Sequence, residues 1–148
     1  MTPLDLAQVF EGEAEIAGDV ANPFIVWCLR SCDPEASDDE IPWCGGFISR
    51  MCALRHLPYS RSLRARSWLR IGTPTDLADA VPGYDVAILK RGHAPQPGPE
   101  VIAAPGHVGF YAGRADDGGI LIYGGNQSNK VGTMRVPIDQ ILGIRRLA

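Results

Sequence analysis

Helical and strand patterns are segregated along this chain of 148 residues, and their order constrains its fold more than any single motif. Apolar residues recur at helical spacing before residue 72, whereas short strand patterns bounded by turn residues follow residue 84. The expected helices cover residues 4–17, 23–31, 44–56 and 61–70, with a helical turn near 74–79. The expected strands cover residues 86–89, 107–112, 120–123, 131–136 and 143–147. This order predicts an α+β fold in which N-terminal helices pack on an antiparallel β-sheet.

Composition and length fit one folded domain that spans residues 1–148. Hydrophobic residues make up 45% of the chain and charged residues 21%, which is ordinary for a globular protein. A chain of this length buries a real core but leaves little room for a second one. No apolar run approaches the roughly 20 residues of a membrane-spanning helix. The first residues are acidic where a secretory signal would be basic and then apolar. We therefore expect a protein made in the cytoplasm without a signal peptide, with no membrane partner.

The cysteines and histidines are distributed in a way that argues against a metal site. Four cysteines, Cys28, Cys32, Cys44 and Cys52, precede residue 53 and form no Cys-x-x-Cys pair, and the three histidines are scattered. Structural metal sites need closely spaced ligands, and disulfide frameworks are rare in cytosolic proteins. We expect no metal, no disulfide framework and no cofactor.

Charge is segregated although the net charge is only −3. Residues 1–43 hold ten acids against one arginine, whereas residues 44–70 hold six arginines and no acid. This segment does not interleave its arginines with several aromatic residues, as a nucleic-acid-binding surface often does. We interpret the arginines as the solvated faces of two helices and expect no nucleic-acid partner. Binding that falls steeply with salt would mark the alternative.

A cysteine lies at the expected start of a helix in the stretch Pro42-Trp43-Cys44-Gly45-Gly46-Phe47. Proline suits a helix start because its missing N–H would be unpaired there. The dipole and free N–H groups of a first helical turn stabilise a thiolate, so Cys44 is a candidate nucleophile. The two glycines leave room for a substrate or another segment to approach closely. The alternative is a small buried core residue, as free cysteines usually are.

Three acidic residues just before this helix act against that effect. Asp38, Asp39 and Glu40 place negative charge near Cys44, which raises the pKa of a thiol, whereas the helix start lowers it. The sequence leaves this balance open.

His107 is the best candidate for the base that a cysteine nucleophile needs. It opens a strand and has a glycine before it and another two residues after it, which leaves its ring accessible. A hairpin through residues 116–119 returns the chain beside it and ends at Asn126. An amide there can orient the imidazole, as in a Cys-His-Asn arrangement. Gln127 is a second candidate for this position, and a plain turn is the alternative for both.

Four segments, taken in order, resemble the NlpC-type and CHAP-type cysteine peptidoglycan hydrolases. They are Pro42-Trp43-Cys44, Pro82-Gly83-Tyr84-Asp85-Val86, Gly106-His107-Val108-Gly109-Phe110-Tyr111 and Gly124-Gly125-Asn126-Gln127-Ser128-Asn129. Within these hydrolases the chain is most similar to a small single-domain group common in phages and prophages. The resemblance implies a papain-like α+β fold and the cleavage of amide bonds in the peptide of the cell wall.

The resemblance also implies roles for individual residues. Cys44 is expected to be the nucleophile, His107 the base and Asn126 the polar third member. Many relatives have a histidine or a carboxylate at that third position, so Asn126 departs from the common pattern. Substrate contacts are expected from Trp43, Gly45 and Gln127.

Peptidoglycan is the expected partner, and the periplasm is the expected place of action. Delivery from the cytoplasm would need a holin, a phage particle or a secretion machine, and a secreted effector would also need an immunity protein. One alternative keeps the fold but makes the protein an acyltransferase or deamidase that acts on protein or lipid. Another is a non-catalytic structural module of a phage. The wall bond that is cleaved, between peptide and glycan or within the peptide, is left open.

Overall fold

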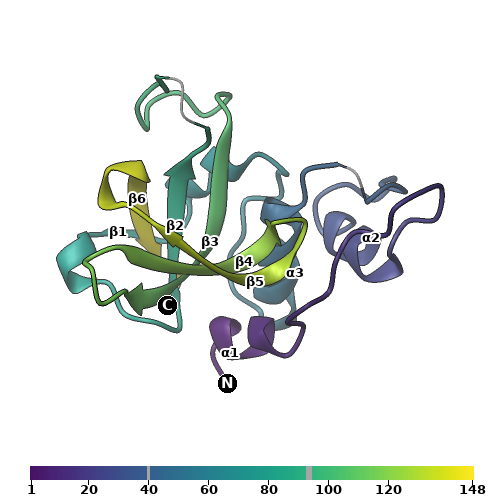
Figure 1. Cartoon of the computed structure of the whole chain (residues 1–148), viewed down its shortest axis with the longest axis horizontal. Coiled ribbons are helices and arrows are strands. Elements are labelled where there is room, and N and C mark those ends of the chain that lie inside the picture. The colour runs from purple at the N-terminus through teal and green to yellow at the C-terminus, as the bar shows by residue number, and fades with distance from the viewer. Residues whose placement is uncertain (40, 93–94) are drawn as a thin grey trace.

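The described part of the chain folds into a six-stranded antiparallel sheet with helices packed against it (Figure 1). The computed structural model describes residues 1–39, 41–92 and 95–148. Its α-helices are α1 (Pro3–Gln8), α2 (Pro23–Leu29) and α3 (Cys44–Leu54), and its 3-10 helices are η1 (Ala65–Arg70), η2 (Leu77–Asp79) and η3 (Ile138–Gln140). Its strands are β1 (Thr73–Thr75), β2 (Asp85–Lys90), β3 (Gly106–Arg114), β4 (Ile120–Gln127), β5 (Lys130–Val136) and β6 (Ile141–Arg146). The α+β class and the antiparallel sheet expected from the sequence are confirmed.

The strand order is β1-β6-β2-β3-β4-β5, and each neighbouring pair is antiparallel. Helix α3 packs on β3 and β4, and α1 and α2 pack on α3. The main apolar core lies between these helices and the sheet, and a smaller cluster that includes Leu89, Tyr111 and Ile122 covers part of the sheet separately. In Figure 1, α3 lies beside β4, α1 lies below the strands and α2 lies to their right. The described residues of the loop between β2 and β3 lie at the top of the same view.

Helix α3 has Cys44 at its first position. Trp43 precedes it as the N-cap residue, and the N–H of Phe47 donates to the Trp43 carbonyl at 2.9 Å, which closes the first turn. The expected start of this helix is therefore confirmed. The helix ends at Leu54, slightly before the expected end, because the backbone reaches a φ of 55° at His56.

The first helix is shorter than expected. Helix α1 ends at Gln8, and the chain then turns at Gly12, whose φ is 88°. The N–H of Gly12 donates to the carbonyl of Val131 at 3.0 Å, and the N–H of Val131 donates to the carbonyl of Glu13 at 2.8 Å. Backbone groups that a longer helix would have paired internally are paired here with the edge of β5 instead.

Residues 61–79 also differ from the expected helices. Only Ala65–Arg70 is helical in the first part of this segment, as η1, and the expected helical turn is divided between β1 and η2. Proline occupies the middle of β1, which is tolerated because β1 lies at the edge of the sheet.

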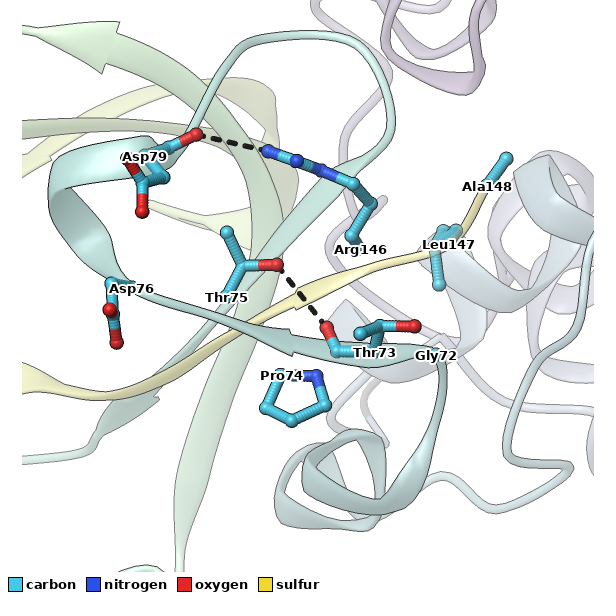
Figure 2. Close-up of a pocket in the computed structure, with 9 residues that line it drawn as sticks. All are labelled: Gly72, Thr73, Pro74, Thr75, Asp76, Asp79, Arg146, Leu147 and Ala148. Carbon is cyan, nitrogen blue, oxygen red and sulfur yellow. Dashed lines mark hydrogen bonds between the residues drawn. The ribbon is translucent and has the colours of Figure 1, made fainter.

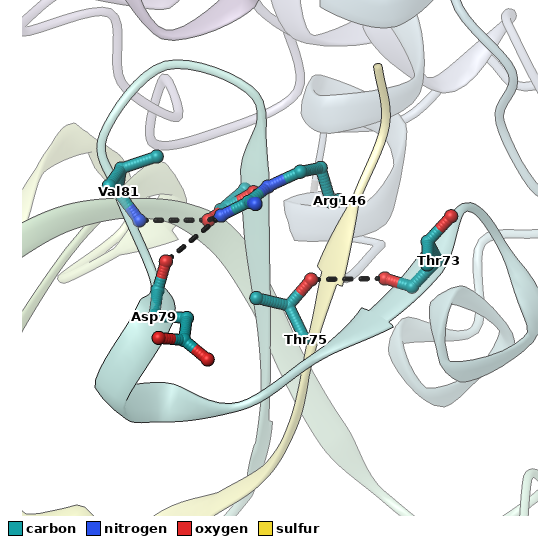
Figure 3. A network of polar contacts seen from close by, with 6 residues as sticks. Thr73, Thr75, Asp79, Val81 and Arg146 are labelled. Carbon is teal, nitrogen blue, oxygen red and sulfur yellow. Dashed lines mark hydrogen bonds and ion pairs between the residues drawn. The ribbon is translucent and has the colours of Figure 1, made fainter.

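A buried carboxylate on β2 binds an arginine on the neighbouring strand β6 (Figure 3). Asp85 is fully buried, and the guanidinium of Arg146 donates to both of its oxygens at 2.7 Å. The N–H of Val81 donates to the same carboxylate at 2.8 Å, and Arg146 also donates to the carbonyl of Asp79 at 3.0 Å. Such two-pronged pairing satisfies a charge that would otherwise be strongly destabilising inside the fold.

Candidate active site

Cys44 is almost completely buried, with 2% of its surface exposed, and it borders a hollow of about 240 Å³. The hollow lies between the start of α3, residues 63–65 and residues 103–106 of the loop before β3. We call it the thiol hollow. The first N–H groups of α3, which have no partner within the helix, lie at the end of this hollow that Cys44 borders.

His107 stands beside this thiol at the start of β3. The pairing of β2 with β3 sets it opposite Leu89, and only 7% of its surface is exposed. Its imidazole lies close enough to the thiol of Cys44 for each side chain to shift the pKa of the other. The structure therefore brings together the two side chains that the sequence singled out.

The interaction between Cys44 and His107 favours the charged form of each side chain. Burial alone would raise the pKa of Cys44, but the hydrogen bond and charge of His107 outweigh it and lower that pKa below its usual range. Burial alone would lower the pKa of His107, but the hydrogen bond and charge of Cys44 raise it above its usual range. Each group thus stabilises the charged form of the other.

Gln127 occupies the third position of the site. Its Oε1 lies 3.0 Å from Nε2 of His107, and its Nε2 donates to the carbonyls of Ile122, at 3.1 Å, and Gly132. Because those two carbonyls require the amide nitrogen on their side, Oε1 must face the imidazole. Nε2 of His107 therefore carries a proton, and Nδ1 is the nitrogen left for exchange with Cys44.

Asn126 does not make the contact expected of it. The pairing of β4 with β5 steps from Gly124 opposite Gly132 to Gln127 opposite Lys130, which places one extra residue on β4. This is a β-bulge, and Asn126 lies within it at a φ of 57°. The bulge puts Gln127 where an uninterrupted strand would put Asn126. Asn126 instead borders a second hollow, of about 380 Å³, which His107 also lines. We call it the histidine hollow.

Trp43 and Gly45 face the protein itself, which differs from the substrate contacts expected of them. The Trp43 ring is fully buried, and its Nε1 donates to Oε1 of Glu15 at 2.9 Å. A Cβ added at Gly125 would lie 2.6 Å from this ring. A Cβ added at Gly45 would lie 2.9 Å from the carbonyl oxygen of Leu63. Both residues therefore pack the start of α3 against neighbouring segments.

The sequence left open whether the acids before α3 or the helix start set the pKa of the thiol, and the structure gives Asp39 a different role. Asp39 accepts hydrogen bonds from the N–H groups of Ile16, at 3.0 Å, and Asn22, at 2.8 Å, and these bonds lower its own pKa. It thereby holds the N-terminal segment in place. Glu40 lies outside the described residues. The largest influence that opposes ionisation of Cys44 is burial, which the sequence did not reveal.

Arg66 is a site residue that sequence reasoning missed. It is fully buried, which contradicts its interpretation as part of a solvated helix face. Its guanidinium donates to the carbonyls of Pro97, at 3.0 Å, Gly98, at 2.7 Å, and Pro105, at 2.9 Å. The proline-rich loop before β3 is thus folded around a buried cation, and residues 103–106 of that loop form a wall of the thiol hollow.

A larger hollow lies elsewhere in the described structure (Figure 2). It measures about 710 Å³ and is lined by β1, the end of η2 and the C-terminal residues. Arg146, the cationic side chain in its lining, is already engaged by Asp85 and by the carbonyl of Asp79. Cys44, His107 and Gln127 do not border it. This hollow therefore has no part in the chemistry of the candidate site.

Across the described ranges, no three His, Cys, Asp or Glu side chains gather closely enough to hold a metal ion. In the same residues, every helix is too short or too polar to span a membrane.

Comparisons with known proteins bear on the fold. No family model matches the chain, and no curated protein matches its sequence. Among solved structures, NlpC1 from Trichomonas vaginalis is similar over 98% of this chain, with a TM-score of 0.51 and 16% sequence identity. The chain spans 42% of the length of that structure. The likeness shows that the chain has an NlpC-like fold.

Proposed function

We propose that this protein is a cysteine peptidase or amidase that cleaves amide bonds in the peptide of peptidoglycan. One observation carries the proposal: Cys44, at the first position of α3, lies close enough to His107 for each side chain to shift the pKa of the other, and His107 is hydrogen-bonded in turn to Gln127. A nucleophile, a base and a group that orients the base are the parts that thiol catalysis requires. The NlpC-like fold is consistent with this activity. Peptidoglycan as the substrate rests on the sequence resemblance.

The proposed reaction begins from the thiolate–imidazolium pair. The sulfur of Cys44 attacks the carbonyl carbon of the amide, and N–H groups at the start of α3 stabilise the oxyanion. Each such donor typically contributes about 3–4 kcal/mol. His107 gives a proton from Nδ1 to the leaving amine, which leaves a thioester on Cys44. Water then attacks the thioester with His107 as base, and the acid product leaves.

Digestion of purified peptidoglycan tests the proposal. We expect the wild-type protein to release soluble fragments with new amino groups, and mass spectrometry of these fragments identifies the bond that is cleaved. Protein carrying Cys44→Ala is the matched control and should release none. Intact peptidoglycan after incubation with a folded, alkylation-competent wild-type protein would overturn the proposal. Acyl transfer or deamidation of protein substrates by the same thiol would then support the alternative function.

The third position gives a sharp comparison between two neighbouring amides. Gln127→Ala should lower kcat/KM by about 10- to 100-fold, because the imidazole loses the acceptor that holds its orientation. Asn126→Gly should change kcat/KM by less than about twofold, and glycine accepts the φ of 57° at this position. Both variants are assayed on the same peptidoglycan, with thermal unfolding as a check of the fold. A larger loss in Asn126→Gly than in Gln127→Ala would return the third role to Asn126.

The relationship of the protein to known hydrolases and its route to the cell wall are further parts of the proposal. The CHAP-type relationship, the phage association and the papain-like detail of the fold stay predictions. Delivery to the wall by a holin, a phage particle or a secretion machine, and an accompanying immunity protein, are likewise predictions. Secretion and lysis assays in a bacterial host would test them.

A further inference from the structure

Arg91 lies between the two hollows of the site. It directly follows β2 and borders both the thiol hollow and the histidine hollow. Its charge acts on both reacting groups, lowering the pKa of Cys44 and that of His107. Its guanidinium is therefore within electrostatic reach of any group that binds across the thiol.

The charge around Arg91 is one-sided. Among the described residues that border either hollow there is no Asp or Glu, whereas Arg64 borders the thiol hollow and Lys90 the histidine hollow. Arg64 donates to the carbonyl of Ala103 at 3.3 Å and so belongs to the wall. Within the described residues, Arg91 makes no hydrogen bond or ion pair, and its side chain is exposed. Its donors are available to a ligand that spans the two hollows.

We infer that Arg91 binds a carboxylate of the substrate next to the amide that is cleaved. A planar guanidinium holds a carboxylate through two parallel N–H bonds, which fixes its position as well as attracting it. A peptide whose scissile carbonyl lies at Cys44 would place a free carboxylate at Arg91 while its ends occupy the two hollows. The inference rests on the proposed function, because it takes Cys44 as the nucleophile, and it adds the substrate class: an acidic peptide.

Two alkylating reagents test this inference without any peptide. In both iodoacetate and iodoacetamide the thiolate attacks the CH₂ carbon, an S–C bond forms and iodide leaves. The two reagents differ in one group, because iodoacetate carries a carboxylate where iodoacetamide carries a neutral amide. The measured quantity is the ratio of their rate constants at Cys44, with peptide mapping to assign the label. Loss of Arg91 changes the reactivity of the thiolate toward both reagents, so the ratio isolates the attraction of the carboxylate.

We expect Arg91→Gln to lower the ratio of iodoacetate to iodoacetamide rates by about tenfold at low salt. Arg114→Gln is the matched control. It removes the same charge from an exposed position seven residues along β3 from His107, about 23 Å away. Its ratio should stay within about twofold of the wild-type value. An unchanged ratio in Arg91→Gln, or an equal fall in both variants, would overturn the inference.

The outcome is separable from that of the peptidoglycan digestion. A fall in the ratio specific to Arg91→Gln supports the carboxylate site even if peptidoglycan is left intact, in which case only the proposed wall substrate fails. Digestion of peptidoglycan together with an unchanged ratio overturns the carboxylate site alone.

Discussion

Replacing His107 with alanine is expected to lower the rate of amide cleavage by about 10³-fold or more, because the variant loses both the base and the charge that favours ionisation of Cys44. Cys28 and Cys52 show how burial affects the pKa of a thiol in this protein when no imidazole lies beside it. Both are buried thiols, and burial raises the pKa of each above its usual range. Burial is also the largest influence on Cys44. Without the imidazole, the pKa of Cys44 should rise in the same direction.

The pH dependence of alkylation separates this loss from a general fault in the site. The thiolate fraction rises as pH increases through the pKa of Cys44, so its lowered pKa places the rising limb of the rate below the pH at which an ordinary thiol ionises. In His107→Ala that limb should move to higher pH. Rates with iodoacetamide, assigned to Cys44 by peptide mapping, measure the shift.

The control for this variant is His56→Asn. His56 is exposed at the end of α3, and asparagine tolerates its φ of 55°. Its cleavage rate and its alkylation profile should match the wild type. A profile in His107→Ala that coincides with that of the wild type would contradict the ion pair.

Elements with local signals were predictable from the sequence. Asn22 and Pro23 mark the start of α2, and in the structure the Asn22 side chain accepts from the N–H of Phe24 at 2.9 Å as an N-cap. The start of α3 at Cys44 and the strand that carries His107 were found in the same way. The end of α1 was not, because it depends on pairing with Val131, more than a hundred residues away in the chain.

The third site residue shows where strand alternation misleads. In an uninterrupted strand, Ile122, Gly124 and Asn126 share one face, and His107 points to the same face from β3. The bulge before Gln127 shifts the pattern by one residue, and bulges leave little trace in a single sequence. The burial of Arg66, one of six arginines in residues 44–70, could not be predicted from the sequence either. The carbonyls that bind it belong to a loop some thirty to forty residues further along the chain.

Replacing Arg66 with methionine is expected to have the largest effect on the loop before β3. Methionine keeps much of the buried volume but removes the donors to Pro97, Gly98 and Pro105. Bonds from a charged donor contribute about 1.5–3 kcal/mol each, and part of their loss is offset because no cation has to be desolvated. We expect a net loss of about 2–4 kcal/mol in the free energy of unfolding. The rate of amide cleavage should also fall by about 10- to 100-fold, because residues 103–106 form a wall of the thiol hollow.

Two measurements distinguish an opened loop from a globally weakened fold. Hydrogen exchange at residues 95–105 should become fast in Arg66→Met under conditions where β3 and β4 remain protected. In Arg66→Lys, the exchange rate of the loop should lie between those of the wild type and Arg66→Met. A single ammonium cannot reach carbonyls on both sides of the loop as a guanidinium does. Arg70→Met, which removes an exposed arginine from the same 3-10 helix, is the control and should leave both readouts unchanged. Uniformly faster exchange across the sheet in Arg66→Met, with no excess in the loop, would show that Arg66 supports the whole fold rather than the wall of the active site.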